Sequence, residues 1–483
     1  MTSSELPRSG LDAADRAITR GTAAVLVVLG FLPLSGWISG GLSDPAYSTR
    51  WMEWSYGVAV CVGVGVICAI LSRSLAPETT STWKRMLQRV NGTLELHPGR
   101  VDVGIAAACL ALYALIAFFV FSAKPLLIDE LVQVLQARMY ATGHLSTPVD
   151  ASPEFFSILH MVDTGERVYS QFPPGWPAML ALGALVNATW LVGPVCGGMA
   201  VFVFAKLLRR TLPTASGGAV AAMTTLFGLA PFAAFQFSSH MSHGPVLMWL
   251  IIAVLALSYV TAAEAIPEST RGWWAALMGF AAGCAFAVRP LDAVAFGAPA
   301  GAWLAWRELS GRSSTRILAA ASAGLAIPAF IVMWVNLRTT GSPFLFGYEA
   351  LWGSSHGLGF HAAPWGDAHT AQRGVELLST YVTRLNVYLF ESPFPSLLPV
   401  IVALLLTGRL SRMERYLFAS TSIHALLYFA YWHDGFFLGP RFVMPWLPLL
   451  IVLCARLPGH STWHAWPIRV RAGVIGGVAA AGV

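Results

Sequence analysis

Residues 126–148 read LLIDELVQVLQARMYATGHLSTP. This stretch follows residues 101–123, which are almost wholly apolar and long enough to cross a lipid bilayer. Asp129 and Glu130 therefore stand side by side where the chain is expected to leave the membrane. Charged side chains are costly at that depth, so an acidic pair there indicates a functional site.

The composition of the chain also indicates a membrane protein. Of its 483 residues, 56% are hydrophobic and 11% are charged, whereas soluble domains carry about 25% charged residues. The net charge of +6 is attributed to basic residues in the loops between spans. A nucleic-acid partner is not indicated, because the sequence has no basic patch interleaved with aromatic residues. All six cysteines fall in apolar runs and are interpreted as inert small hydrophobic residues.

The apolar runs predict an all-α polytopic fold with 13 candidate spans. They are residues 23–43, 54–72, 102–123, 190–208, 217–237, 244–263, 273–288, 291–306, 316–337, 394–409, 414–432, 442–457 and 472–483. The apolar segment 174–186 is too short to cross a bilayer and predicts an interfacial helix. Pro174 is expected to be its first residue, where the missing N–H costs nothing.

The distribution of basic residues predicts the orientation. With the N-terminus in the cytoplasm, 21 of the 30 Lys and Arg residues lie on the cytoplasmic side, as the positive-inside rule requires. Two large loops, 124–189 and 338–393, then face outward. The Ala-, Gly- and Arg-rich composition suggests a bacterial host, so we expect a multi-pass protein of the bacterial inner membrane with its polar site on the periplasmic side.

Asp129 opens a predicted helix over residues 129–141. Helical spacing places Asp129, Gln133, Gln136 and Tyr140 on one stripe. Such a helix would lie on the membrane with this polar face toward a cavity. The competing interpretation is that Asp129 only caps the helix.

Other polar residues lie at the outward ends of spans. Arg289 and Arg441 each stand beside a proline and suit a lipid phosphate, although each could instead snorkel to the interface. His240 and His243 fit metal ligands, substrate contacts or interfacial residues. The Gly-, Trp- and His-rich segment 352–369, which includes His361, suits binding of sugar rings.

The order of these motifs resembles the C-type (GT-C) polytopic membrane glycosyltransferases, which include protein O-mannosyltransferases and lipid A aminoarabinose transferases. In that family an acidic pair opens the first outer loop, and Asp129 and Glu130 match it. Pro173–Gly175 resembles the Pro-Pro start of the family's outer helix, while VRP at 288–290 and GPRF at 439–442 resemble later motifs. A departure is Gln171, where some relatives have a basic residue that meets the lipid phosphate.

The resemblance implies a GT-C fold with about 11–13 transmembrane helices and two large outward-facing loops. It divides the chain into an N-terminal tail with two extra spans and a basic loop (1–100), a seven-span core including outer loop 124–189 (101–337), a second outer loop (338–393) and C-terminal spans (394–483).

The resemblance also implies a sugar donor on polyprenyl phosphate and transfer to an acceptor hydroxyl with inversion. The acceptor, whether protein, lipid or envelope glycan, stays open, as does a requirement for a divalent cation. The implied catalytic residues are Asp129 and Glu130. The implied donor- and substrate-binding residues are Gln133, Arg138, Pro173, Pro174, Gly175, His240, His243, Arg289, His361 and Arg441.

Two other functions fit the sequence. A transporter or flippase of lipid-linked sugars would be expected to carry ionisable groups near mid-membrane and internal repeats, and neither is clear here. A non-catalytic relative of the transferases would be expected to lose the motif residues, yet Asp129, Pro173–Gly175 and Arg441 are all present.

Overall fold

The structure is a computed structural model in which helices dominate. It describes residues 8–32, 34, 45–71, 77–150, 155, 157–263, 266–312, 314–392, 394–433, 437–460, 465–467, 470–471 and 473–474. The N-terminal elements are α1 (Arg8–Phe31), α3 (Pro45–Leu71), α4 (Pro77–Leu96), α5 (Pro98–Leu115) and the π-helical turn η1 (Ile116–Val120). The first outer loop contains α6 (Ile128–Ala141), β1 (Thr147–Pro148), β2 (Met161–Asp163), β3 (Arg167–Ser170) and α8 (Gly175–Ala184).

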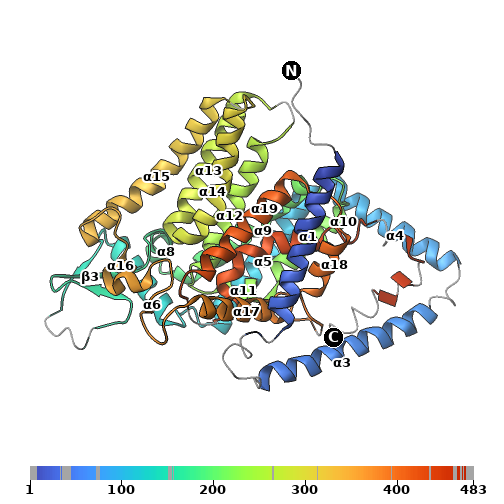
Figure 1. Ribbon diagram of the computed structural model, residues 1–483, viewed down its shortest axis with the longest axis horizontal. Helices are drawn as coiled ribbons and strands as arrows, with labels where there is room; N and C mark the ends of the chain where they lie inside the picture. The colour runs from blue at the N-terminus through green and yellow to red at the C-terminus, as the bar shows by residue number, and fades with distance from the viewer. Residues whose placement is uncertain are drawn as a thin grey trace.

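The remaining elements form most of the helical bundle. They are α9 (Thr189–Thr211), α10 (Gly217–Leu229), α11 (Pro231–Ser238), α12 (His243–Val260), α13 (Glu268–Val288), α14 (Pro290–Leu309), α15 (Thr315–Thr340), α16 (Gly347–Trp352), η2 (Gly353–His356), α17 (Ala371–Tyr388), α18 (Leu398–Leu406), α19 (Arg412–Phe429), η3 (Arg441–Trp446) and α20 (Leu447–Cys454). The long helices α12–α15 stand side by side in Figure 1.

The apolar helices confirm a polytopic membrane protein. Five described helices are long and apolar enough to cross a membrane, within α3, α5–η1, α9, α12 and α15, and the bent pair α10–α11 adds a sixth. The other predicted spans fall on helices that are shorter or carry polar ends, namely α1, α13, α14, α18, α19 and α20. The predicted span 472–483 lies almost entirely outside the described residues.

The predicted span 217–237 is not one straight helix. It consists of α10 and α11, whose axes differ by 57°. The break falls at Ala230, which leaves the helical region with a ψ of 116°. Pro231 explains the break, because proline has no N–H to donate and disfavours helical geometry in the residue before it.

Small residues bring α13 and α15 into close contact. A Cβ atom on Gly279 would lie 1.8 Å from the carbonyl oxygen of Ala321, and one on Gly324 would lie 2.0 Å from that of Ala276. Only glycine allows this approach, which is typical of helix pairs in membranes. The pair α13–α15 therefore forms a closely packed wall that carries Arg289 at the C-terminal end of α13.

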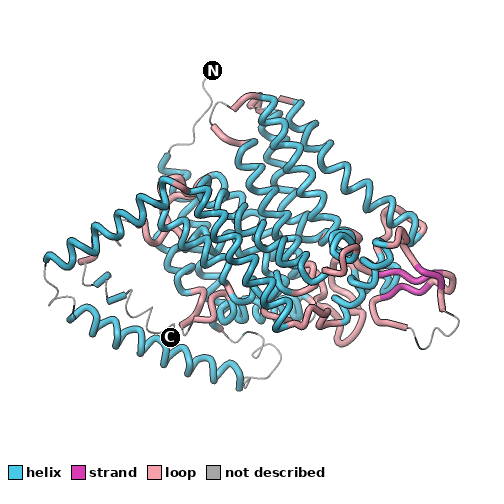
Figure 2. The backbone as a smooth tube through the Cα atoms, turned by 180° about the vertical axis from the view of Figure 1, so that it is seen from behind, coloured by secondary structure: helices cyan, strands magenta, loops and turns pink. Residues whose placement is uncertain are grey.

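The loop elements collect at one end of α12–α15. Figure 1 shows α6, α8, α16 and β3 there, and Figure 2 shows the strands at the same end. The strands form an antiparallel sheet of order β1-β3-β2 in which Val162 pairs with Tyr169. The second outer loop is largely helical, since it contains α16 and the amphipathic α17, whose Asn386 donates to the carbonyl of Gly30 at the end of α1.

Candidate active site

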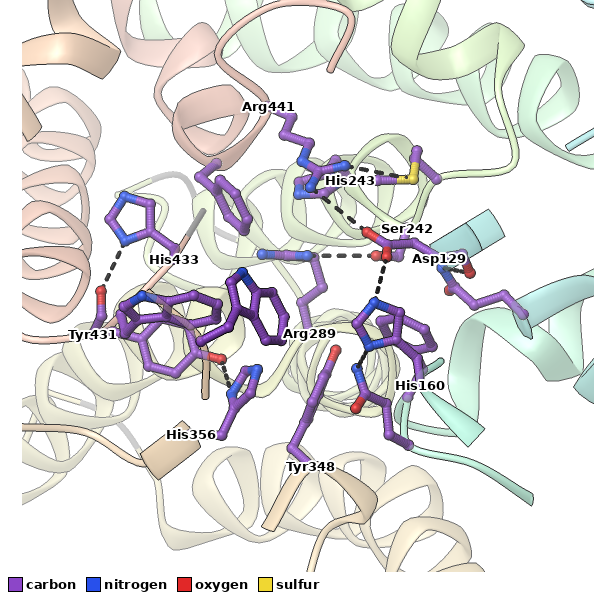
Figure 3. A pocket seen from close by; sticks show the side chains of 17 residues that line it. Asp129, His160, Ser242, His243, Arg289, Tyr348, His356, Tyr431, His433 and Arg441 are labelled. Carbon is purple, nitrogen blue, oxygen red and sulfur yellow. Dashed lines mark hydrogen bonds and ion pairs between the residues drawn. The ribbon is translucent and has the colours of Figure 1, made fainter. Parts of the chain in front are cut away.

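A polar cavity of about 240 Å³ opens at this loop-covered end of the bundle. Figure 3 shows side chains that point into it from six parts of the chain. They come from the start of α6 (Asp129, Gln133), the segments around β2 and β3 (His160, Gln171, Phe172), the link into α12 and its first residue (Met241, Ser242, His243), the junction of α13 and α14 (Arg289), the second outer loop (Tyr348, His356, Trp365) and the C-terminal region (Tyr431, Trp432, His433, Arg441, Phe442).

Asp129 lies in the first turn of α6, and its side chain does not cap the helix. The N-cap residue is Leu127, which forms no side-chain capping bond. The Asp129 carboxylate instead contacts two cavity residues: Oδ1 lies 3.3 Å from Nε2 of His160 and Oδ2 lies 3.6 Å from a terminal nitrogen of Arg441. The capping interpretation is therefore wrong, and the acidic group faces the cavity as the stripe predicts.

A chain of hydrogen bonds orients His160 toward Asp129. The indole N–H of Trp352 donates to Oε1 of Gln171 at 2.7 Å, and the Gln171 amide donates to Nδ1 of His160 at 2.9 Å. This arrangement leaves the proton of neutral His160 on Nε2, where it donates to Asp129. Burial lowers the pKa of His160, although the Asp129 carboxylate opposes that effect.

The backbone at His160 is strained in support of this geometry. His160 has a φ of 72°, in the left-handed region that favours glycine. Its carbonyl accepts the N–H of Gln171 at 3.0 Å, which holds the turn closed. A non-glycine residue held in this conformation beside a cavity is typical of functional sites.

Arg441 brings a buried positive charge to the same cavity. Only 7% of its side chain is exposed, and its Nε has no hydrogen-bond partner within the described residues. Its other contacts are the Asp129 carboxylate and the sulfur of Met241 at 3.9 Å. Snorkelling is therefore the wrong interpretation, and the guanidinium keeps donors available for an anion in the cavity.

Arg289 is held more tightly by protein groups. Its Nε donates to Asp292 at 2.8 Å, and its terminal nitrogens donate to Tyr428 at 2.8 Å and Ser242 at 3.5 Å. Asp292 is buried and also accepts hydrogen bonds from Tyr428 and His424. Arg289 thus forms an ion pair with the buried Asp292 at the cavity wall, and snorkelling is wrong for it as well.

Aromatic residues and neutral histidines form the opposite wall. Tyr348 stacks on His356 at 4.7 Å between ring centres, and the Tyr431 hydroxyl lies 2.8 Å from Nδ1 of His356. Trp365 meets Trp432 edge to face at 4.5 Å. Burial lowers the pKa of His356 to about 4, so this wall carries no positive charge at neutral pH and suits an uncharged ring with hydroxyl groups.

Several predicted site residues lie outside the polar cavity. Arg138 is exposed at the end of α6, and both ring nitrogens of His361 approach backbone carbonyls of its own loop. His240 lies 3.3 Å from the Thr189 hydroxyl. Glu130 is fully buried and accepts the N–H of Leu126 before α6. The position of Glu130 follows from helix phase, because Glu130 is rotated by about 100° from Asp129 on α6.

The Pro173–Gly175 motif lines apolar space next to the polar cavity. Pro174 and Gly175 line a groove of about 380 Å³ between α8, α13 and α15, with Ala178, Leu182 and Trp334 among its other walls. Pro173 and Pro174 also line a small space that Phe172 separates from the polar cavity. A Cβ on Gly175 would lie 2.6 Å from the backbone of Ala287, so this glycine allows α8 to pack against α13.

The carboxyl group of Glu130 predicts a pH-dependent stability. Burial raises its pKa from 4.5 to about 7. Ionisation of this buried carboxyl group therefore lowers the free energy of unfolding. The loss is absent below pH 4.5 and complete above pH 7, where it reaches about 3 kcal/mol. We expect Glu130→Gln, which keeps an oxygen for Leu126, to raise the thermal unfolding midpoint at pH 8 and not at pH 4.5.

The matched control for this substitution is Glu166→Gln, on the exposed part of the same outer loop. It should leave the midpoint unchanged at both pH values. Equal stabilisation by Glu130→Gln at pH 4.5 and pH 8 would show that packing, not ionisation, is responsible.

Metal binding is not supported by a cluster in the described part of the chain. Within those residues, no group of three His, Cys, Asp or Glu side chains is close enough to hold a metal ion. His240 and His243 do not form a pair of ligands, because His243 faces the cavity and His240 faces Thr189.

Comparison with models of known protein families and with curated proteins finds no match. Among solved structures, the crystal structure of ArnT from Cupriavidus metallidurans bound to undecaprenyl phosphate is similar, with a TM-score of 0.51 and 13% identity over 78% of this chain and 62% of that chain. The apo structure of ArnT from the same organism gives a TM-score of 0.48 and 15% identity over 75% and 61%. This chain thus spans about three-fifths of the length of ArnT. ArnT has the GT-C fold, and the shared architecture shows that this predominantly helical membrane protein has the same fold.

Proposed function

We propose that the protein is a glycosyltransferase that moves a sugar from a polyprenyl-phosphate donor to an acceptor hydroxyl. The observation that carries the proposal is the meeting of Asp129 and Arg441 in one cavity, although they are 312 positions apart in the sequence. A proton acceptor beside an anion-binding guanidinium is what such a displacement requires. The ArnT structure in the same fold holds undecaprenyl phosphate, which supports a lipid-linked donor here.

Asp129 is assigned the role of general base. The acceptor oxygen attacks the anomeric carbon of the sugar and forms the new glycosidic bond as its proton passes to the Asp129 carboxylate. The bond between the anomeric carbon and the phosphate oxygen breaks, and the lipid phosphate leaves with that electron pair. A single displacement inverts the anomeric centre. His160 positions the carboxylate through its Nε2 proton.

The two arginines have different roles in this proposal. Arg441 has donors available in the cavity and contacts the leaving phosphate. Arg289 is committed to Asp292 and Tyr428, so it contributes mainly by fixing the wall. Gln133 and His243 line the same space and contact the substrates, while Glu130 fixes the chain that leads into α6.

The apolar groove at α8 is assigned to the lipid chain of the donor. Its walls are Pro174, Gly175 and other apolar side chains, and it lies one residue layer from the polar cavity. The aromatic wall around Trp365 and Tyr348 is assigned to the sugar. In this arrangement, the phosphate lies where the polar and apolar spaces approach each other, at the outer surface of the membrane. We place that surface on the periplasmic side, in line with the distribution of basic residues.

Filling the groove tests the assignment of the lipid chain. Ala178 is exposed and lines the groove, so Ala178→Trp should block the chain without disturbing the core. We expect the KM for a long-chain donor to rise about tenfold, since a few methylene groups lose their contacts, while a short-chain donor is used as before. Val195→Trp, on an exposed face of α9, is the control. Equal effects on long and short donors would contradict the assignment.

The function itself is tested by analysis of envelope glycans and lipid-linked sugars in a deletion strain. The strain is complemented with the wild type, with Asp129→Asn or with an empty vector. Loss of one glycan linkage on deletion, with accumulation of the lipid-linked donor, would support the transferase and identify the sugar. Full restoration of the linkage by Asp129→Asn would contradict it.

A further inference from the structure

A second, larger cavity of about 740 Å³ lies at the opposite end of the bundle. It is formed by the end of α14, the start of α19 and the residues around the start of α13. Helix α14 runs from Arg289 at the polar cavity to this second cavity over 20 residues, which is about 30 Å and matches the hydrocarbon thickness of a bilayer. The two cavities therefore face opposite leaflets.

Five arginines line the second cavity, and few carboxylates balance them. These arginines are Arg271, Arg307, Arg312, Arg412 and Arg415. Arg415 pairs with Asp15 through two contacts of 2.9 Å. Within the described residues, Arg307, Arg312 and Arg412 form no ion pair with a carboxylate. The cavity therefore carries an excess of positive charge.

The contacts of Arg307 leave part of its guanidinium available. Its terminal nitrogens donate to the carbonyls of Thr261 and Arg312 at 3.3 Å each. Its Nε is buried without a hydrogen-bond partner in the described structure. A buried donor without a partner destabilises the protein. An anionic oxygen in the cavity that accepts a hydrogen bond from this Nε would therefore stabilise it.

Aromatic residues place this cavity at the membrane interface. Trp303, Trp306 and Tyr416 line it, and tryptophan and tyrosine are enriched at the level of lipid head groups. Trp306 is 51% exposed, and the Arg312 guanidinium lies 5.0 Å above its ring. The walls thus combine an exposed indole with cations, an arrangement that a free anion in water would not need.

We propose that this cavity binds the head group of an anionic phospholipid with two phosphodiesters, of the diphosphatidylglycerol class. The positive-inside rule explains why the arginines lie on this side, but not why three separate chain segments direct them to one cavity. Basic pockets between helices on the cytoplasmic side suit such head groups, and guanidinium groups bind phosphate oxygens in pairs. The volume exceeds the needs of a single phosphate.

Native mass spectrometry of the full chain in neutral detergent tests the proposal. The probes are tetraoleoyl cardiolipin, dioleoyl phosphatidylcholine and inorganic phosphate. Arg312→Gln with Arg412→Gln removes two exposed cavity arginines, so folding is preserved. The control, Arg89→Gln with Arg316→Gln, removes the same charge from exposed positions outside the cavity.

The wild type should bind one cardiolipin in preference to phosphatidylcholine. The cavity variant should weaken cardiolipin binding by about 30-fold, and the control by less than about twofold. Equal weakening in both variants, or equal affinity for the two lipids, would overturn the proposal. Displacement of cardiolipin by millimolar inorganic phosphate would overturn the lipid as ligand and leave a free-anion site. None of these results depends on transferase activity.

Discussion

Asp129→Asn is expected to lower the rate of sugar transfer by about 1,000-fold, the loss typical of removing a positioned general base. The substitution keeps the size of the side chain and one oxygen that can accept the His160 proton. It removes the second basic oxygen, which faces Arg441. The measurement is the initial rate of transfer by purified protein in nanodiscs, with a lipid-linked donor that the glycan analysis identifies.

The controls for Asp129→Asn separate chemistry from folding. Asp163→Asn changes an exposed carboxylate at the end of β2 on the same loop and should leave the rate unchanged. The thermal unfolding midpoint of Asp129→Asn should fall, because the buried Arg441 loses its carboxylate partner, so the rate is compared at a temperature where both proteins are folded. A rate within about threefold of the wild type would contradict the role of general base.

His160 provides a further check on the same group. Because His160 is neutral and donates from Nε2, His160→Gln should keep part of the rate, whereas His160→Phe should lose more. We expect both substitutions to change the turnover number rather than the KM for the donor, since His160 acts through Asp129. An unchanged turnover number in His160→Phe would show that Asp129 is positioned without it.

The sequence alone predicts the features that depend on local patterns. The helix at 129–141, the short helix over 174–186 and the apolar spans all follow from hydrophobic runs and their periods. The structure has them as α6, α8 and the bundle, with Pro174 as the N-cap of α8 and not its first residue. The resemblance to the GT-C glycosyltransferases implies in addition that Asp129 and Arg441 belong to one site. Local helix phase then separates Asp129, which faces the cavity, from Glu130, which does not.

The site residues that the sequence does not predict are brought to the cavity by contacts between distant segments of the chain. In the sequence, Gln171 is only a departure from the GT-C pattern that the chain resembles, yet its amide links Trp352 to His160. His160, His356 and His433 are three of the 12 histidines in the chain, and no spacing distinguishes them from the others. The three-stranded sheet is likewise not predictable from the sequence, because its strands contain only 2, 3 and 4 residues. Strands that short show too few alternations to be recognised.

Substitutions of Arg289 and Arg441 are expected to differ in their effect on stability, because Arg289 pairs tightly with the buried Asp292. Loss of Arg289 would leave Asp292 buried without its cation, and an orphaned buried charge costs about 3–5 kcal/mol. Arg289→Gln should therefore lower the thermal unfolding midpoint. Arg441 has a looser contact, 3.6 Å from a carboxylate that also has His160 as a partner, so its loss should affect stability much less.

Arg441→Gln is expected to weaken binding of polyprenyl phosphate by about 100-fold, because the leaving phosphate loses a buried cationic donor. Polyprenyl phosphate without a sugar is the informative probe, since its binding requires no proton transfer. Asp129→Asn should retain this binding, whereas Arg441→Gln should lose it. Arg441→Lys should recover only part of the affinity, because a single ammonium group cannot donate two hydrogen bonds in the fixed geometry of a guanidinium. If Asp129→Asn and Arg441→Gln weaken binding equally, the arginine serves only to hold the base, and the phosphate must contact other residues.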